Sequence, residues 1–269
     1  MDCTRVPLEV ATRAPTGRTA AYCLGEDEAL LVDPAAASDE LDGILTDRTV
    51  THVAVTHHHP DHVGAVEQYA VAHDATVWCR YGREAAFEAA TGVAPDRTFV
   101  DGTTIPVAGG DVQVVDLPGH APEHVGFRFA DGENEALDDG ATAYLVGDIA
   151  VAAGSVVVGA PEGDMRAYVA SLRRLWARNP ETLYPAHGPV IENPRETCTR
   201  LIAHRRDREA RVLAAVRDGA RTVSEITDAA YEKDLSGVRD LAEATVLAHL
   251  EKLAVEGCLT WDGDEAVPT

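Results

Sequence analysis

At 269 residues the chain is long enough for one α/β unit or for a larger domain followed by a smaller one, and its 45% hydrophobic content is ordinary for a globular protein. Its five cysteines are odd in number and form no C-x-x-C pair, which argues against a disulfide framework and a thiolate zinc site. No apolar run approaches the ~20 residues of a membrane span, and the N-terminus lacks a basic segment followed by an apolar one. We therefore expect a soluble cytoplasmic protein without a membrane partner.

The charge is the unusual feature of the composition. Asp and Glu outnumber Lys and Arg by 45 to 23, which gives a formal net charge of −22 at pH 7, and the only lysines are Lys233 and Lys252. Acidic tracts at residues 25–28 and 131–135 are typical of solvated loops. We interpret the composition as halophilic, because concentrated salt screens the self-repulsion of such a chain. An acidic protein from an ordinary cytoplasm is the alternative, and the scarcity of lysine favours the halophilic interpretation.

The halophilic interpretation predicts that salt stabilises the fold. We expect the melting temperature to rise as KCl increases from about 0.1 M to about 2 M, over which the screening length falls below about 3 Å. Thermal unfolding followed by circular dichroism measures this. A melting temperature that stays flat or falls over that range would contradict the interpretation.

The first two thirds of the chain alternate strand and helix patterns. Helical spacing covers residues 62–73 and 164–178. Strand patterns cover residues 29–34, 50–56, 75–78, 111–117, 125–129 and 143–146. This alternation predicts an α/β or layered α+β domain that ends near residue 195.

After that point the pattern becomes helical. We expect helices at residues 200–217, 222–231 and 238–255, the second opened by the capping-box spacing of Thr222 and Glu225. A short strand at 258–261 then enters a tight turn. Helix, helix, helix and hairpin is the order of a winged-helix module, so residues 196–269 are predicted to form a small helical winged-helix-like domain.

Residues 51–64, THVAVTHHHPDHVG, place four histidines and an aspartate directly after an expected strand. In an extended chain His57 and His59 point the same way, and Asp61 and His62 begin the next helix. Neutral imidazole and carboxylate are good zinc ligands at about 2.0–2.2 Å. Three further strand ends each carry one such side chain: His120, Asp148 and His187. Alone, each would more often be an ordinary hydrogen-bonded residue, but together they complete two metal sites.

The motif order H-x-H-x-D-H, P-G-H, G-D and A-H-G-P resembles the metallo-β-lactamase superfamily over roughly residues 5 to 195. The resemblance implies an α+β fold, an αββα sandwich formed by residues 1–195. It implies two zinc ions, with iron or manganese as alternatives. One ion would be held by His57, His59 and His120, and the other by Asp61, His62 and His187. Asp148 would bridge the two, since one carboxylate can hold two cations about 3.5–4 Å apart.

The resemblance also implies a metal-dependent hydrolase. A water held between the two metals would be deprotonated near neutral pH and would attack an ester, thioester or phosphodiester, with Asp61 and Asp148 as catalytic residues. Asp148 stands where classical lactamases have cysteine or serine, and His59 where flavodiiron proteins have glutamate, which argues against both activities. Hydroxyacylglutathione-hydrolase-like thioesterases and mononuclear iron persulfide dioxygenases keep the ligand set and remain open.

The C-terminal helices resemble the lactamase-beta-like group, whose members carry a winged-helix-like domain and in some cases cleave single-stranded RNA. The expected substrate is therefore a small molecule or single-stranded RNA. Ala121 and Ala20 depart from the family pattern near the expected active site, so the substrate does not carry over from the resemblance. A nucleic-acid-binding regulator with a relic lactamase domain is the non-enzymatic alternative.

Four further residues are predicted to support the ligands or the substrate. Asp33 and His124 are candidates to orient metal ligands, whereas Arg205 and Arg206, in the only arginine-rich stretch, suit a substrate phosphate. The alternative is that Asp207 and Glu209 pair with these arginines on an exposed helix. Acidic residues on the third helix make DNA binding unexpected, which leaves packing, homodimer formation or gating as its role. We expect His58 to line the pocket, and His52, His73 and His249 to lie at the surface or core edge.

Overall fold

The structure is a computed structural model that describes residues 1–130 and 142–269, so the predicted acidic loop at 131–135 lies outside the described residues. Contacts within the chain divide it into two compact units, described here one at a time. The first contains Met1–Asp116, Glu123–Ala153 and Asn179–Pro194, and the second contains Leu117–Pro122, Gly154–Arg178 and Arg195–Thr269. The division into domains at residue 195 stays a prediction.

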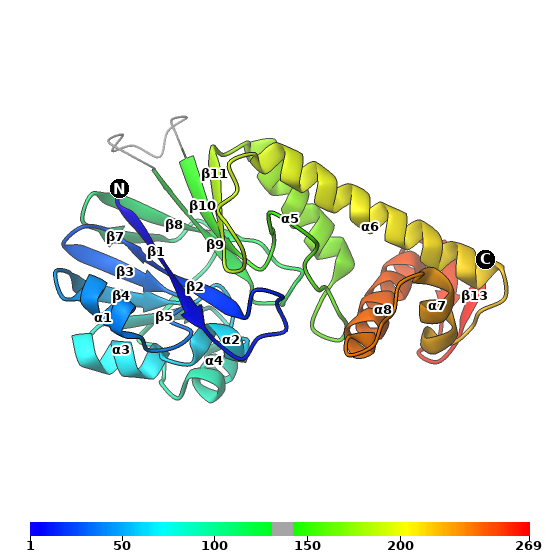
Figure 1. Cartoon of the computed structure of the whole chain (residues 1–269), viewed down its shortest axis with the longest axis horizontal. Coiled ribbons are helices and arrows are strands. Elements are labelled where there is room, and N and C mark those ends of the chain that lie inside the picture. Colours follow the sequence, from blue (N-terminus) through cyan, green and yellow to red (C-terminus); the bar gives the residue numbers. More distant parts are fainter. Residues whose placement is uncertain (131–141) are drawn as a thin grey trace. The chain divides into compact units, whose positions relative to one another are not determined.

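The first unit contains two sheets that face each other (Figure 1). The six-stranded sheet consists, in spatial order, of β1 (Cys3–Glu9), β2 (Arg18–Leu24), β3 (Glu28–Val32), β4 (Thr49–Ala54), β5 (Thr76–Arg80) and β6 (Arg97–Phe99). The five-stranded sheet consists of β11 (Thr182–Pro185), β10 (Thr142–Gly147), β9 (Val125–Ala130), β8 (Gly110–Asp116) and β7 (Thr104–Val107). Strands β3 to β6 are parallel, and so are β10 and β11. Parallel neighbours end at the same edge of their sheet, which is where the predicted ligands follow their strands.

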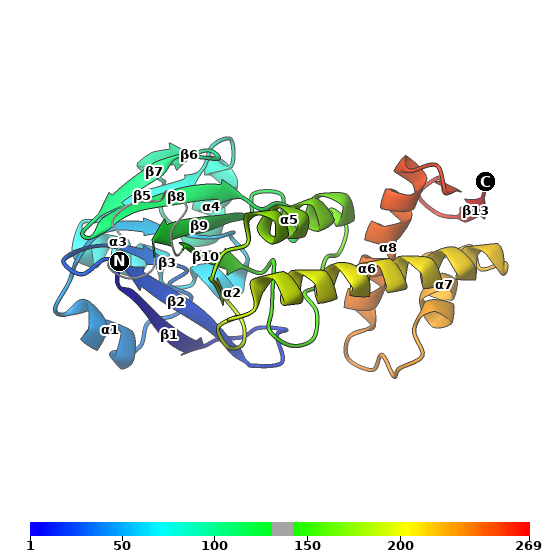
Figure 2. The ribbon, with the colours of Figure 1, turned by 90° about the horizontal axis from the view of Figure 1, so that it is seen from above.

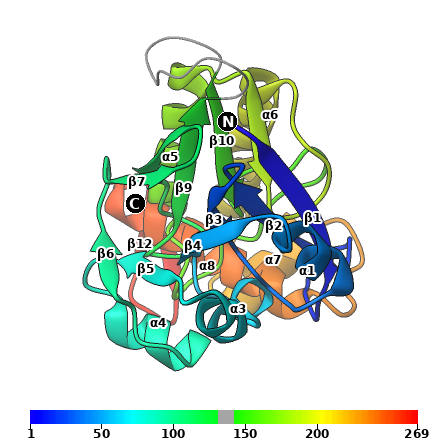
Figure 3. The same ribbon diagram turned by 90° about the vertical axis from the view of Figure 1, so that its left-hand side faces the viewer.

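The core of this unit lies between the sheets and behind the larger one. Alternate side chains such as Tyr22 and Leu30 of the first sheet and Val114 and Phe127 of the second are fully buried together. The opposite side chains of the six-stranded sheet pack against α1 (Asp39–Leu45), α3 (Val66–His73) and α4 (Glu84–Thr91) (Figure 3). Each such side chain stabilises the fold by about 1.5–3 kcal/mol through the apolar surface it removes from water.

The helix expected at residues 62–73 is in fact two helices, α2 (Pro60–Val63) and α3. The chain breaks at Gly64, where a Cβ atom would lie 2.4 Å from the carbonyl oxygen of Ala35. The next amide, of Ala65, donates to the carbonyl of Pro34 at 2.9 Å. The Ala65 amide is therefore bonded to the segment after β3 and not to the preceding turn of a continuous helix. Periodicity along residues 62–73 cannot reveal this contact.

The second unit is mainly helical (Figure 2). Its elements are α5 (Met165–Arg178), α6 (Pro194–Arg217), α7 (Val223–Ala230), α8 (Arg239–Val255), β12 (Leu259–Trp261) and β13 (Ala266–Pro268). The capping box at Thr222 and Glu225 is confirmed. The C-terminal half of α6, α7, α8 and the β12–β13 hairpin share one apolar core that includes Val216, Ile226 and Leu250. None of the described helices is long and apolar enough to cross a membrane.

Candidate metal centre

The segment that runs from the end of β4 through α2, residues 55–63, carries four of the predicted ligands. It stays extended up to His59, whose φ and ψ are −64° and 149°, so His57 and His59 face each other with Nε2 and Nδ1 3.0 Å apart. Pro60 then starts α2, as proline readily does at the first helical position. That turn brings Asp61 and His62 to the same side of the chain. There they lie close to Asp148 and His187, which follow β10 and β11.

Asp148, directly after β10, lies between ligands of both predicted sites. Its two carboxylate oxygens lie 3.8 Å from His62 Nε2 and 3.4 Å from His187 Nε2. Its ligand atoms also fall within 4.8 Å of those of His57 and His62, one from each predicted site. Asp61, His62 and His187 form a further group of the same compactness. Asp148 thus occupies the place that a bridging carboxylate would take.

The donor set fits a transition-metal cation. Ligands about 2.0–2.2 Å from a tetrahedral ion lie roughly 3.3–3.6 Å from one another. His187 Nε2 lies 3.4 Å from Asp148 Oδ2 and 3.7 Å from Asp61 Oδ2, close to that spacing. His62 Nε2 is buried and has no hydrogen-bond partner among the described residues. A buried Nε2 that faces carboxylates without a hydrogen-bond partner is costly, and a bound cation, either a proton or a metal ion, offsets that cost.

Hydrogen bonds on the far side of each ring decide which nitrogen faces the centre. The carbonyl of Arg18 lies 2.8 Å from His187 Nδ1, and a carboxylate oxygen of Asp33 lies 3.0 Å from His62 Nδ1. Both partners can only accept, so each Nδ1 carries the proton and each Nε2 presents its lone pair. Such partners orient a metal-binding histidine and raise its basicity.

Asp33 is the centre of this supporting network. It is 1% exposed, and its carboxylate accepts from the backbone N–H of Thr56 at 2.7 Å and from the Thr56 hydroxyl at 2.8 Å. The same hydroxyl lies 3.0 Å from His57 Nδ1, so one carboxylate orients His62 directly and His57 through Thr56. The structure thus places Asp33 against the ligands, as the sequence suggests.

His124 holds the backbone of Asp148 in place through a hydrogen bond. It is fully buried, and its Nε2 accepts the backbone N–H of Asp148 at 3.1 Å. Gly147, the last residue of β10, has a φ of 47°, and a Cβ there would lie 2.6 Å from His124 Nε2 and 2.7 Å from Thr56 Oγ1. Only glycine combines that left-handed backbone with so close an approach.

The carboxylates around His62 and His187 favour positive charge on these two histidines. Burial by itself would lower the pKa of His62, but nearby carboxylates outweigh burial and raise it to about 9. These carboxylates, in order of effect, are Asp33, Asp148 and Asp61. The pKa of His187 is also raised, because its hydrogen bond to Asp148 and the charge of that group overcome the effect of burial. Without a cation the centre therefore holds protons, and metal binding would release them.

His120, the seventh predicted ligand, belongs to the short segment Leu117–Pro122 of the second unit. Its Nδ1 donates to the carbonyl oxygen of Val157 at 2.7 Å, which again leaves Nε2 as the nitrogen with a lone pair. The preceding Gly119 has a φ of 133°, and a Cβ there would lie 2.3 Å from the backbone of Tyr168. This close approach explains the glycine of the P-G-H motif.

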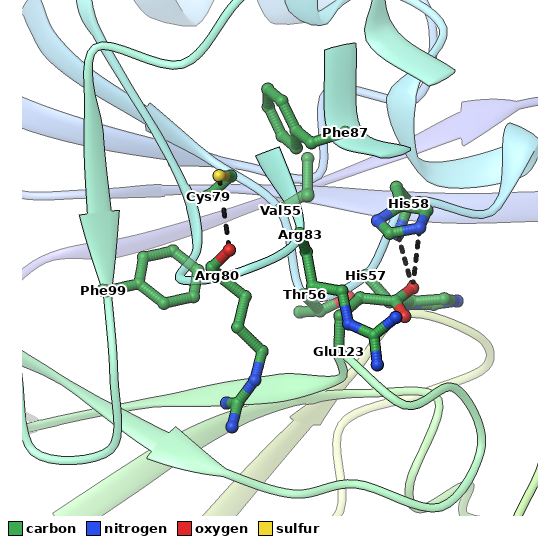
Figure 4. A pocket seen from close by; sticks show the side chains of 10 residues that line it. All are labelled: Val55, Thr56, His57, His58, Cys79, Arg80, Arg83, Phe87, Phe99 and Glu123. Carbon is green, nitrogen blue, oxygen red and sulfur yellow. Dashed lines mark hydrogen bonds and ion pairs between the residues drawn. The ribbon is translucent and has the colours of Figure 1, made fainter. Parts of the chain in front are cut away.

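A small pocket lies beside His57 in the first unit (Figure 4). Its volume of about 10 Å³ is room for one water molecule. His58 lines it, as expected, and its Nε2 lies 3.3 Å from a carboxylate oxygen of Glu123, which is 5% exposed. Sequence reasoning missed Glu123, because a glutamate between two histidines has no distinctive spacing.

The two predicted phosphate-binding arginines differ in exposure. Arg205 is 3% exposed; its guanidinium donates to the carbonyl of Val156 and lies 5.2 Å from the centre of the Tyr168 ring. Arg206 is exposed. Glu209 pairs with Lys252 at 2.6 Å instead of with an arginine. Burial of Arg205 within its own unit leaves it poorly suited to hold a phosphate.

The expectation for His249 is wrong. This histidine was expected at the surface or core edge, and the structure buries it completely, with Nδ1 3.7 Å from a carboxylate oxygen of Glu209. The reason is that α8 is apolar on more than one face, so one of its polar positions also becomes enclosed.

Several known proteins are similar to this chain in sequence. The chain is 33% identical over 171 residues to the lactamase-like protein vrtG of Penicillium aethiopicum, covering 62% of this chain and 48% of that protein. It is 27% identical over 231 residues to an atrochrysone carboxyl ACP thioesterase of Aspergillus fumigatus, covering 81% of this chain and 66% of that protein. The chain thus spans about half to two thirds of these relatives.

A metallo-beta-lactamase family protein from Thermus thermophilus shares the fold over 99% of this chain and 98% of its own, with a TM-score of 0.77 and 24% identity. The sequence pattern of the metallo-beta-lactamase superfamily matches residues 14–187. That match covers most of the chain and includes all seven predicted ligands, and the fold is the mixed α+β fold of the group. The chain therefore belongs to the metallo-beta-lactamase superfamily.

Proposed function

We propose that this chain hydrolyses thioesters at a dinuclear zinc centre. The observation that carries the proposal is the position of Asp148, which groups with His57 of one predicted site and with His62 of the other. Two bound zinc ions would supply Lewis acidity to polarise the thioester carbonyl and would activate water near neutral pH.

The chain's own residues would hold and orient this centre. His57, His59 and His120 are the proposed ligands of one ion, and Asp61, His62 and His187 those of the other. Asp148 is the proposed shared ligand. Asp33 and His124 keep His62 and Asp148 in place through the hydrogen bonds described above. A centre held this way would need little rearrangement when substrate binds.

Two observations favour a thioester over RNA. A relative that aligns with 81% of the chain is named as an acyl carrier protein thioesterase. Beyond the family resemblance of the C-terminal helices, the RNA alternative rested on Arg205 and Arg206, and Arg205 is buried against Val156 and Tyr168. We also propose that residues 196–269 form a winged-helix-like module with a packing role, since three helices and a hairpin share one core there.

Substrate comparison on metal-loaded protein tests the proposal. Elemental analysis should find about two zinc ions per chain, as for other bridged centres. In high salt, we expect kcat/KM for an acyl-pantetheine thioester to exceed that for the matched oxygen ester, a generic phosphodiester and single-stranded RNA by about a hundredfold or more, which is about 2.7 kcal/mol of transition-state discrimination.

Other outcomes would assign a different function. Faster cleavage of single-stranded RNA than of any thioester would contradict the proposal and restore the RNA alternative. A single iron per chain with oxygen consumption on a persulfide would identify a dioxygenase instead.

A further inference from the structure

The loop between β1 and β2, residues 10–17, reaches two ligands of the same predicted metal site. The hydroxyl of Thr12 lies 2.5 Å from Asp61 Oδ2. Directly after the loop, the carbonyl of Arg18, the first residue of β2, accepts the Nδ1 proton of His187 at 2.8 Å. Asp61 and His187 belong with His62 to the second predicted site, so this loop and the residue that follows it contact two of the three ligands of that site.

The direction of the Thr12 hydrogen bond follows from its neighbours. The backbone N–H of Ala14 donates to the Thr12 hydroxyl oxygen at 3.1 Å, so this oxygen is already an acceptor. An ionised carboxylate can only accept, and the hydroxyl proton is therefore donated to Asp61. Hydrogen bonds to an ionised acceptor are roughly twice as strong as neutral ones, so this contact holds Asp61 firmly.

The carboxylate of Asp61 is thereby held beside both histidines of this site. With Oδ2 held by Thr12, Oδ1 lies 4.0 Å from His62 Nε2, and Oδ2 itself lies 3.7 Å from His187 Nε2. Asp61 has intermediate exposure, whereas His62 is fully buried. Asp61 is thus the ligand of this site with most freedom to turn away, and Thr12 removes that freedom.

The loop is built to hold its shape. Its ends are joined by the hydrogen bond from Val10 N–H to Gly17 O at 3.3 Å, and Gly17 N–H donates to Ala14 O at 3.1 Å. Gly17 has a φ of 64°, a conformation that suits glycine, and allows the chain to turn back into β2. A loop closed by its own backbone can position Thr12 before any metal binds.

We propose that Thr12 is a positioning residue that sets the metal affinity of the Asp61, His62 and His187 site. His57, in the other site, is held by Thr56 instead. The two proposed metal ions therefore differ in their dependence on Thr12. This inference rests on the dinuclear centre proposed above, but not on the identity of the substrate.

Zinc titration against a competing chromophoric chelator tests the inference on the full chain. For Thr12→Val and Thr12→Ala, which both remove the hydroxyl, we expect one of two zinc equivalents to bind about 10–100-fold more weakly, as for other residues that support metal ligands. Thr12→Ser keeps the hydroxyl and should bind both equivalents like the parent. The matched control is Thr46→Val, which removes an exposed hydroxyl bonded to a backbone carbonyl at the end of α1.

The inference is overturned if Thr12→Val and Thr12→Ala bind both equivalents as tightly as the parent. It is also overturned if both equivalents weaken equally, since Thr12 would then act on the whole fold. The melting temperatures of the metal-free variants check that each one folds. A parent that binds two zinc ions but cleaves no thioester would contradict the proposed function and leave the role of Thr12 standing.

Discussion

Replacing Asp148 by alanine should lower kcat/KM by about a thousandfold or more, because the lost metal interactions stabilise the transition state by several kcal/mol. The same change should reduce bound zinc, since Asp148 lies between His62 and His187 with its oxygens 3.8 and 3.4 Å from their Nε2 atoms. Steady-state kinetics and elemental analysis measure the two effects.

The fold should survive this substitution. The contact that Asp148 makes with His124 uses its backbone N–H, which alanine keeps. The metal-free variant should therefore keep a cooperative thermal unfolding transition, shifted only by the lost ion pairs of Asp148 with His62 and His187. Asp47→Ala, at an exposed aspartate of the same unit, is the matched control and should keep both zinc and activity. Full zinc occupancy in Asp148→Ala would remove Asp148 from the centre.

Replacing Asp33 by alanine should destabilise the first unit by about 3–5 kcal/mol, the usual cost of removing one partner from a buried charged network. The change leaves the buried N–H of Thr56 and the Nδ1 proton of His62 without their acceptor. Asp33 also has a φ of 51°, which alanine adopts less readily than aspartate or asparagine. Urea unfolding of the metal-free protein measures the loss.

Asp33→Asn separates stability from metal binding. Asparagine keeps the backbone conformation and one acceptor oxygen for Thr56, so the loss of stability should be smaller than for alanine. Its amide N–H₂ would face His62 Nδ1, which favours the tautomer with the proton on Nε2 and blocks that ligand. We therefore expect one zinc equivalent to bind about 10–100-fold more weakly. Equal stability and zinc affinity in the parent and both variants would show that Asp33 does not support the centre.

Local pattern predicted much of this molecule. Strand alternation located β3, β4, β8, β9 and β10 to within a few residues, and the capping box located the start of α7. Both patterns depend on residues only two to four positions apart, so they survive whatever the rest of the chain does. The exception, the break between α2 and α3, arises from Ala35, which lies about thirty residues earlier in the chain and reaches Gly64 only after β3 has paired with β4.

The amino-acid sequence by itself determined the chemistry of the candidate centre: which side chains are available as ligands, and that they follow strands. The sequence also suggested Asp33 and His124 as supports, but only the tertiary structure decided which ligand each support contacts and added Thr12. Thr12 and Asp61, or Asp33 and His62, are separated by 49 and 29 positions and meet through the packing of different strands and loops. The same holds for Arg205, whose charge suggests a phosphate although the fold buries it against Val156. A side chain's type fixes which bonds it can form, and the bonds it does form depend on which distant neighbours the folded sheets and helices bring to it.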